Sequence, residues 1–329
     1  LNEWSLWGEI EPREIEKALK ENDDVALVWI TNPTYEGVVS NVKAIADICK
    51  KYDVPLVVDE AHGCLWNFNK NLPESSLHLG ADAVVHSLHK TGGSMSQSSM
   101  LHITEGSKFD PDEIERTLQL LQTTSPSMLL MASLDAARAN LESKHGKKQL
   151  NRAIQHAKYV RKRLHKIEGV HVLEATENYN QDVTKVFVRV DGLSGKRLES
   201  ILEIDFDIEV ESASDIGVLL LINIGNTKQE IQYLVNAFEK IAHAQYSDIY
   251  YIENRKHMPM LTPQIVMNPR EAYYSEKETI SKEQAVGRIS AEVIAECPPG
   301  ISILLPGELI TQEHMPYLNE YKYLEVIKK

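Results

Sequence analysis

Two short apolar runs in the first third of the chain each end in polar residues. The run 54–58 leads into Asp59, and the run 83–85 leads into Ser87 and Lys90. Apolar runs of this length are typical of strands buried in a parallel sheet. Because ligands collect beyond the carboxyl ends of such strands, the pattern predicts that an acid and a lysine meet at one small molecule.

The remaining pattern alternates predicted strands with predicted amphipathic helices, which favours an α/β fold with parallel βαβ units. Strand-like apolar runs are predicted at 25–30, 170–173, 184–188 and 217–222. Helices are predicted at 11–20, 42–50, 195–203 and 228–242, with a long helical stretch from about Pro126 to Lys166 that is broken at Gly146. The proline-punctuated piece from about Ser247 is predicted to be a separate domain.

An acid and a lysine delivered by two strand ends suit pyridoxal phosphate chemistry. The Lys90 amine can form a Schiff base with the cofactor aldehyde, and the Asp59 carboxylate can keep the pyridine nitrogen protonated. Ala61 lies on the same face of an extended chain as Asp59 and leaves room for a flat ring. Ser87 and His89 can donate hydrogen bonds to a phosphate. Taken singly, Asp59 could equally be a strand-end cap and Lys90 a solvated lysine.

Longer motifs around these residues resemble the pyridoxal-phosphate-dependent Orn/Lys/Arg decarboxylases, which have the aspartate-aminotransferase type of fold. The resemblance covers nearly the whole chain. It is carried by the segments Thr31–Gly37, Asp59–Gly63, Leu79–Asp82, Ser87–Thr91, Gln97 with Leu101-His102, Thr124–Ser127, Leu130–Asp135, Pro298–Ile301 and Pro306–Glu308.

The resemblance implies a role for each residue of the candidate site. Lys90 is expected to be the Schiff-base lysine, Asp59 the partner of the ring nitrogen and Ala61 the residue under the ring. His62 is expected near the cofactor and near the proton-transfer path. Ser87 and His89 are expected to help fix the phosphate.

The implied reaction is decarboxylation of a basic amino acid to carbon dioxide and a polyamine precursor. Arginine, giving agmatine, is favoured over lysine and then ornithine, because the chain resembles the shorter, biosynthetic type of this family. Glu60, Glu211 and Glu296 are acidic candidates for the distal cation of the substrate, and each could instead be a surface or domain-interface carboxylate. The turn at Pro298 is expected near the active-site entrance.

The resemblance also divides the chain. Residues 1–140 are expected to form the lysine-bearing part of a fold type I cofactor domain, incomplete at its N-terminus. Residues 141–246 are expected to form the small α/β domain, and 247–329 a C-terminal decarboxylase domain. Since Leu1 is not methionine, we expect an upstream part that supplies the phosphate loop and a ring-stacking residue.

Composition narrows the possible partners and the location. A formal charge of −13 argues against a nucleic-acid surface and suits cationic substrates loosely. There is no run of about eighteen apolar residues and no signal-type start, so no membrane partner is expected. The odd, scattered set of cysteines, Cys49, Cys64 and Cys297, suits reduced thiols in a cytoplasm. The family further implies a homodimer or higher homo-oligomer.

Two other interpretations of the sequence remain open, and a third is not favoured. An aminotransferase would share Asp59 and Lys90, but would leave the C-terminal Pro-Pro-Gly-Ile element unexplained. A non-catalytic regulatory paralogue or fragment would explain a missing upstream half. A metal site at His86-x-x-His89 lacks the helical H-E-x-x-H spacing and paired cysteines, so no metal is expected.

Overall fold

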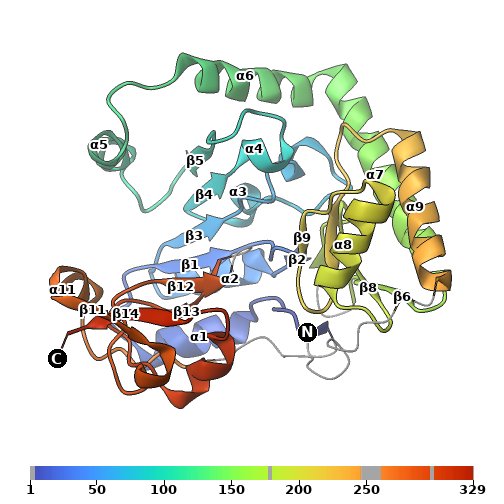
Figure 1. Cartoon of the computed structure of the whole chain (residues 1–329). Coiled ribbons are helices and arrows are strands. Elements are labelled where there is room, and N and C mark those ends of the chain that lie inside the picture. Colours follow the sequence, from blue (N-terminus) through green and yellow to red (C-terminus); the bar gives the residue numbers. More distant parts are fainter. Residues whose placement is uncertain (1–3, 177–179, 245, 247–260, 297–299, 329) are drawn as a thin grey trace. The chain divides into compact units, whose positions relative to one another are not determined.

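Four short strands form the first sheet of the computed structural model, which describes residues 4–176, 180–244, 246, 261–296 and 300–328 (Figure 1). The strand order is β1-β3-β4-β5, with β1, β3 and β4 parallel and β5 antiparallel to β4. The strands are β1 Val28–Thr31, β3 Leu56–Asp59, β4 Ala83–His86 and β5 Met100–Ile103. The predicted parallel rhythm is therefore confirmed for three strands, whereas β5 was not predicted.

Helices and apolar side chains cover this first sheet. Ile45 and Ala46 of α2 pack on Leu56, Val58 and Val84 of the strands, and all of these side chains are buried. Asn41 is the N-cap of helix α2, because its side chain accepts a hydrogen bond from the Ala44 amide. The helices of this part are α1 Pro12–Glu21, α2 Val42–Lys51, the 3₁₀ turn Trp66–Phe68, α3 Ser76–Leu79, α4 Leu88–Thr91 and α5 Pro111–Leu121.

The long predicted helix is two helices, α6 Met128–Glu142 and α7 Lys144–Leu164. The break falls at Ser143, which has an extended backbone and whose hydroxyl accepts a hydrogen bond from the Gly146 amide. The prediction of a break at Gly146 was therefore wrong. Gly146 lies inside the first turn of α7, where an added Cβ would be 1.9 Å from the Asn140 carbonyl oxygen. This glycine allows the two helix ends to approach closely.

A second sheet follows α7, with strand order β6-β8-β10-β9 and antiparallel pairing throughout. Helices α7, α8 and α9 bury their apolar faces on it, forming one core that includes Leu164, Val188, Leu202 and Phe238. A separate two-stranded sheet, β2 Val38–Val39 with β7 Asn180–Gln181, joins the first part of the chain to the segment just before β8. The remaining elements are β6 Val170–Val172, β8 Lys185–Val190, α8 Gly195–Phe206, β9 Ser212–Ala213, β10 Val218–Leu221 and α9 Lys228–His243.

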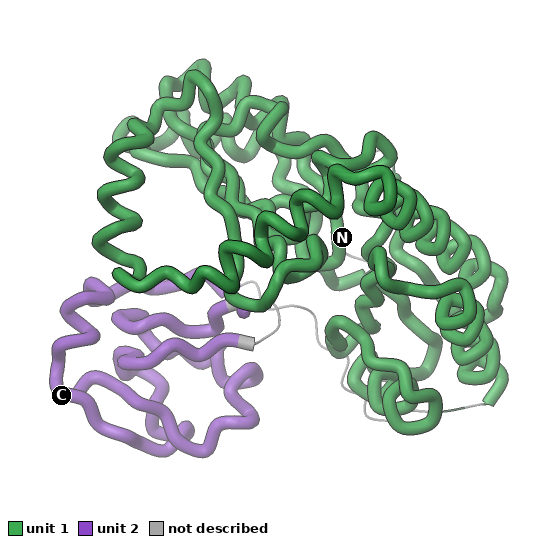
Figure 2. Tube along the Cα trace, turned by 90° about the horizontal axis from the view of Figure 1, so that it is seen from above, with its two compact units in different colours: residues 1–255 green, residues 256–329 purple. Residues whose placement is uncertain are grey.

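Both sheets belong to one compact unit, Leu1–Arg255, and Lys256–Lys329 forms a second unit (Figure 2). The second unit has its own core, centred on Ile303, Leu304 and Val326. Its elements are α11 Pro269–Tyr274, β11 Lys277–Ser281, the 3₁₀ turn Lys282–Gln284, β12 Ile294–Glu296, β13 Ile301–Leu304, the 3₁₀ segment Gln312–Tyr317 and β14 Tyr323–Ile327. None of the helices described is both long and apolar enough to cross a membrane.

Candidate active site

The carboxyl end of β3 delivers Asp59 to the edge of the first sheet. Asp59 pairs with Thr31 of β1 on one side and Val85 of β4 on the other, so three strands end together there. Its Oδ1 accepts a hydrogen bond of 3.0 Å from the Ala61 amide. Among the described residues, nothing donates to Oδ2. The carboxylate is thus oriented by the chain and keeps one oxygen for a ligand.

The next residue, Glu60, fixes the turn that carries Asp59 and His62. Glu60 is fully buried, and its two oxygens accept hydrogen bonds from the Ser75 hydroxyl at 2.5 Å and the Ser76 amide at 2.8 Å. His86 Nε2 also donates to Oε1 over 2.8 Å. All of these partners are protein groups, so the expectation of Glu60 as a candidate for the substrate cation was wrong.

Removing this carboxylate should destabilise the whole turn. Glu60→Ala leaves the donors of Ser75, Ser76 and His86 buried without an acceptor, which typically costs about 3–5 kcal/mol. We expect urea denaturation followed by circular dichroism to show a clearly lower midpoint for this variant. Glu74→Ala, at an exposed neighbouring carboxylate, should change stability by only about 0.5 kcal/mol or less. Equal midpoints for the two variants would show that Glu60 does not hold the turn.

His62 lies behind the sheet edge with only 9% of its surface exposed. Its ring packs edge-on against Tyr35, with ring centroids 4.9 Å apart and planes at 80°. Its Nε2 is 2.9 Å from Lys90 Nζ. Burial, and then the nearby charges of Lys185, Lys90 and His89, lower the pKa of His62 to about 2. The imidazole is therefore neutral at physiological pH.

Lys90 lies on the one-turn helix α4, which begins directly after β4. The Lys90 amide donates to the Ser87 carbonyl at 3.1 Å, and the Ser87 amide donates to the Ala61 carbonyl at 3.3 Å. These bonds join the lysine loop to the Asp59 loop. The Lys90 side chain is exposed, so its amine can be reached from solvent. Asp59 and Lys90 share no hydrogen bond or ion pair within the described part of the chain, and His62 is the site residue that touches Lys90.

Two further residues of the predicted site frame this helix. The Ser87 hydroxyl makes no capping bond to α4, which leaves it available to a ligand. His89 Nδ1 donates to the Ser98 carbonyl at 2.7 Å, and the Ser98 hydroxyl lies 2.7 Å from that of Ser94. This contact fixes the ring plane and the tautomer of His89, with the proton on Nδ1.

Sequence reasoning missed Lys185, the first residue of β8. Its side chain is 1% exposed, and its Nζ donates to the Tyr35 carbonyl at 2.8 Å and lies 3.1 Å from His62 Nδ1. Gly37 makes room for it, because an added Cβ there would be 2.8 Å from Lys185 Cδ. A lysine at the start of an otherwise apolar strand was the available signal, but the contact to His62 spans 123 residues.

The two other acidic candidates lie elsewhere. Glu211 Oε1 accepts a hydrogen bond of 2.7 Å from the hydroxyl of Tyr35, whose ring packs against His62. This bond and burial raise the pKa of Tyr35, with burial the larger cause. The side chain of Glu296 lies outside the described residues, as does the Pro298-Pro299 turn. Within the described ranges, no group of three or more His, Cys, Asp or Glu residues is placed to hold a metal ion.

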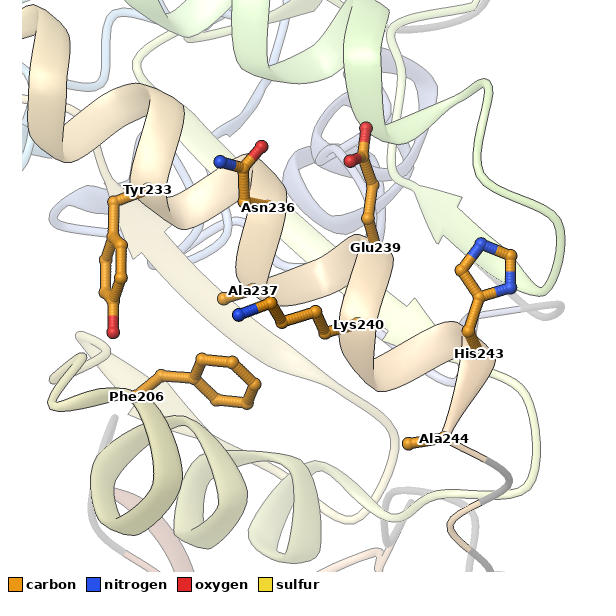
Figure 3. Close-up of a pocket in the computed structure, with 8 residues that line it drawn as sticks. All are labelled: Phe206, Tyr233, Asn236, Ala237, Glu239, Lys240, His243 and Ala244. Carbon is orange, nitrogen blue, oxygen red and sulfur yellow. The ribbon is translucent and has the colours of Figure 1, made fainter.

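A separate pocket lies between the end of α8 and one face of α9 (Figure 3). Phe206 of α8 and Tyr233, Lys240 and His243 of α9 are among the residues that line it. It contains none of the residues that the sequence pattern singled out. We therefore place the candidate site at the edge of the first sheet, where the hydrogen-bonded Lys90 and His62 lie.

Comparison with known proteins gives two family matches. Residues 2–189 match "Orn/Lys/Arg decarboxylase, major domain", and residues 252–329 match "Orn/Lys/Arg decarboxylase, C-terminal domain". An arginine decarboxylase of Halalkalibacterium halodurans is 37% identical over 320 residues, covering 93% of this chain and 63% of that protein. The chain thus spans less than two thirds of the length of this curated relative.

Solved structures agree with the fold. The lysine decarboxylase A from Pseudomonas aeruginosa superimposes with a TM-score of 0.82 at 20% identity, covering 98% of this chain and 62% of that chain. An alanine–glyoxylate aminotransferase from Nostoc sp. gives a TM-score of 0.54 at 18% identity, covering 71% of this chain and 66% of that one. These likenesses confirm the predicted α/β fold of the aminotransferase type.

Proposed function

Because the chain belongs to the Orn/Lys/Arg decarboxylase family, we propose that it carries the lysine half of a pyridoxal-phosphate-dependent decarboxylase active site. The observation that carries the proposal is the Lys90 amine, exposed and hydrogen-bonded to a neutral His62, at the strand edge that ends in Asp59. The product is carbon dioxide and the amine of a basic amino acid, a polyamine precursor. The enzyme is accordingly a lyase.

The residues of the site suit pyridoxal phosphate. Asp59 Oδ2, which accepts no bond from the described residues, suits a protonated ring nitrogen. Ala61 is small enough to lie under the ring, and the Ser87 hydroxyl, which makes no capping bond to α4, and the His89 ring would bind the phosphate. When bound, the cofactor supplies an electron sink for the carbon that loses the carboxylate.

Each residue then has a defined task. Lys90 would hold the cofactor aldehyde through its amine. Asp59 would keep the ring nitrogen protonated by its negative charge. His62, neutral and in contact with the Lys90 amine through Nε2, would lie near the proton-transfer path.

Arginine is our first choice of substrate, followed by lysine and then ornithine. Support comes from curated relatives at 36–37% identity that are named arginine decarboxylases. The lysine decarboxylases among the relatives are 23–24% identical. None of the described contacts distinguishes a guanidinium from an ammonium group.

We also propose a division into three parts, an oligomeric state and a location. Residues 1–140 carry the lysine, 141–246 form the small domain around the second sheet, and 247–329 form the C-terminal domain. A homodimer or larger homo-oligomer is supported by exposed apolar side chains on α5 and α6, including Leu120, Leu121, Met128 and Leu129. A cytoplasmic location is supported by Cys49 and Cys64, which are buried and unpaired.

The direct test is amine production. The 329-residue chain and a longer chain matching the full length of its relatives are each incubated with pyridoxal phosphate and arginine, lysine or ornithine. We expect agmatine from arginine at a higher rate than cadaverine or putrescine. Absence of any amine from the longer chain would contradict the decarboxylase proposal in favour of a non-catalytic role. A keto acid in place of an amine would identify an aminotransferase.

A further inference from the structure

The buried side chain of Lys185 reaches from the second sheet to the His62 ring. Its Nζ donates to the Tyr35 carbonyl at 2.8 Å and lies 3.1 Å from His62 Nδ1. The Tyr35 ring in turn packs edge-on against the His62 ring. One amine therefore contacts the imidazole directly and also binds the residue that packs against it.

The backbone of Lys185 is fixed by a buried arginine. Arg161 of α7 is only 5% exposed. Its guanidinium donates to the carbonyls of Leu173, Val183 and Lys185. The Lys185 amide also donates to the Asp182 carbonyl at 3.1 Å. The long lysine side chain therefore starts from a firmly bound backbone, which it needs if it is to fix the position of another group.

A second buried contact joins the same two segments of the chain. The indole N–H of Trp66 donates to Asp182 Oδ2 at 2.8 Å. The other oxygen of Asp182 accepts hydrogen bonds from the amide and the hydroxyl of Thr184, at 2.9 and 2.6 Å. The segment 62–66 thus meets the segment 182–185 at two points, which fixes the His62 backbone relative to Lys185.

The two contacts of the His62 ring differ in permanence. Lys90, at Nε2, has an exposed side chain, and under the proposed function its amine is the group that would bind the cofactor. Lys185, at Nδ1, is 1% exposed, and its other partner is a backbone carbonyl. The Lys185 contact is therefore the one that can hold the ring while Lys90 is engaged elsewhere.

We propose that Lys185 is a positioning residue that holds the His62 ring from the second sheet, so that Nε2 keeps its direction when Lys90 is no longer bound to it. That Lys90 leaves His62 for a cofactor rests on the proposed function, whereas the hold of Lys185 on the ring does not. A ring held in this way needs no reorientation when the group at Nε2 changes. Such preorganisation is worth most for groups close to the reacting atoms.

The mobility of the ring tests this proposal without any cofactor or substrate. The histidines of the full chain are labelled with carbon-13, and the order parameter of the His62 ring is measured by NMR relaxation, its signal being the one that His62→Leu removes. In Lys90→Ala the Nε2 contact is gone, and we expect the ring to stay rigid, with an order parameter of about 0.85. Adding Lys185→Met should lower it below about 0.6. Adding Lys196→Met, at an exposed residue of α8, should leave the ring rigid.

Two results would overturn the proposal. A mobile ring in Lys90→Ala alone would show that Lys90 holds the imidazole, and a rigid ring in Lys90→Ala with Lys185→Met would show that Lys185 does not. The carboxylates of Asp182, Glu211 and Glu36 lie near the Lys185 amine, so Lys185→Met removes their cationic neighbour and is expected to lower stability. The measurement on Lys90→Ala does not require that variant to fold.

Kinetics of the longer chain show what the positioning contributes to the reaction. Lys185→Met should lower kcat about tenfold or more with little change in KM, because misplacing a group near the reacting atoms can cost up to about 10²-fold. In the His62→Leu background the same substitution should have little further effect, since the ring that it positions is absent. An equal loss in both backgrounds would overturn the proposal. A longer chain that produces no amine would contradict the proposed function, and the NMR measurement would still decide whether Lys185 holds the ring.

Discussion

Lys90→Ala should abolish amine production from every basic amino acid. Under the proposed function, the substitution removes the amine that would bind the cofactor covalently and that contacts His62 Nε2. Proton transfer alone is worth up to about 10⁴-fold, so we expect a fall of about 10⁴-fold or more in kcat/KM. Agmatine, cadaverine and putrescine are measured by chromatography. The substitution is introduced into the longest form of the chain that shows activity.

The control for this result is a lysine that lies nearby in sequence and outside the site. Lys70 is exposed between the Trp66–Phe68 turn and α3, and Lys70→Ala should retain full activity. A small primary amine such as ethylamine, added to Lys90→Ala, should restore part of the rate because it replaces the missing nucleophile. Comparable rates for Lys90→Ala and Lys70→Ala would show that another residue binds the cofactor.

The sequence pattern was sufficient to locate the two strand ends. Runs such as Leu56–Val58 are apolar on both faces because helices cover the sheet, and such runs end where the chain meets polar surroundings. The predicted convergence of the Asp59 and Lys90 loops therefore needed only the rule that parallel strands end at one edge. In the structure, the hydrogen bond from the Ser87 amide to the Ala61 carbonyl joins the two loops at that edge.

Contacts between distant segments were beyond such local reasoning. Glu60 was an acidic candidate for the distal cation of the substrate, yet Ser75 and His86, 15 and 26 residues further on, donate hydrogen bonds to its carboxylate. Lys185 was overlooked because the sequence shows it only as a polar residue at the end of a predicted strand. Its contact with His62 is visible only in the three-dimensional structure.

Glycine was the least reliable of the local signals. At Gly146 it was interpreted as a helix break, although Ser143 provides the cap and the break. At Gly37 it was part of a turn motif, whereas the structure shows a left-handed residue with φ of 93° that also makes space for Lys185. A missing side chain can mean backbone freedom or a close neighbour, and sequence alone does not separate the two.

Asp59→Asn should lower kcat/KM about 10²–10³-fold, the usual loss when one oriented electrostatic partner of a reacting system is removed. Asparagine has nearly the shape of aspartate, and its Oδ1 can still accept the bond from the Ala61 amide. The turn and the fold should therefore survive. Under the proposed function, what is lost is the negative charge that would keep the ring nitrogen protonated, and with it the capacity of the cofactor to accept electrons.

The measurement pairs activity with cofactor binding. For Asp59→Asn we expect a lower kcat, weaker retention of pyridoxal phosphate on dialysis and an unchanged thermal midpoint. Asp47→Asn is the matched control, because Asp47 is an exposed residue of α2 whose partner is Lys43, and its kinetics should equal those of the parent. If both variants kept nearly full activity, the ring nitrogen would have a partner other than Asp59. The absence of a donor to Asp59 Oδ2 would then need another explanation. A large loss confined to Asp59→Asn would place the electron-accepting end of the cofactor at the carboxyl end of β3.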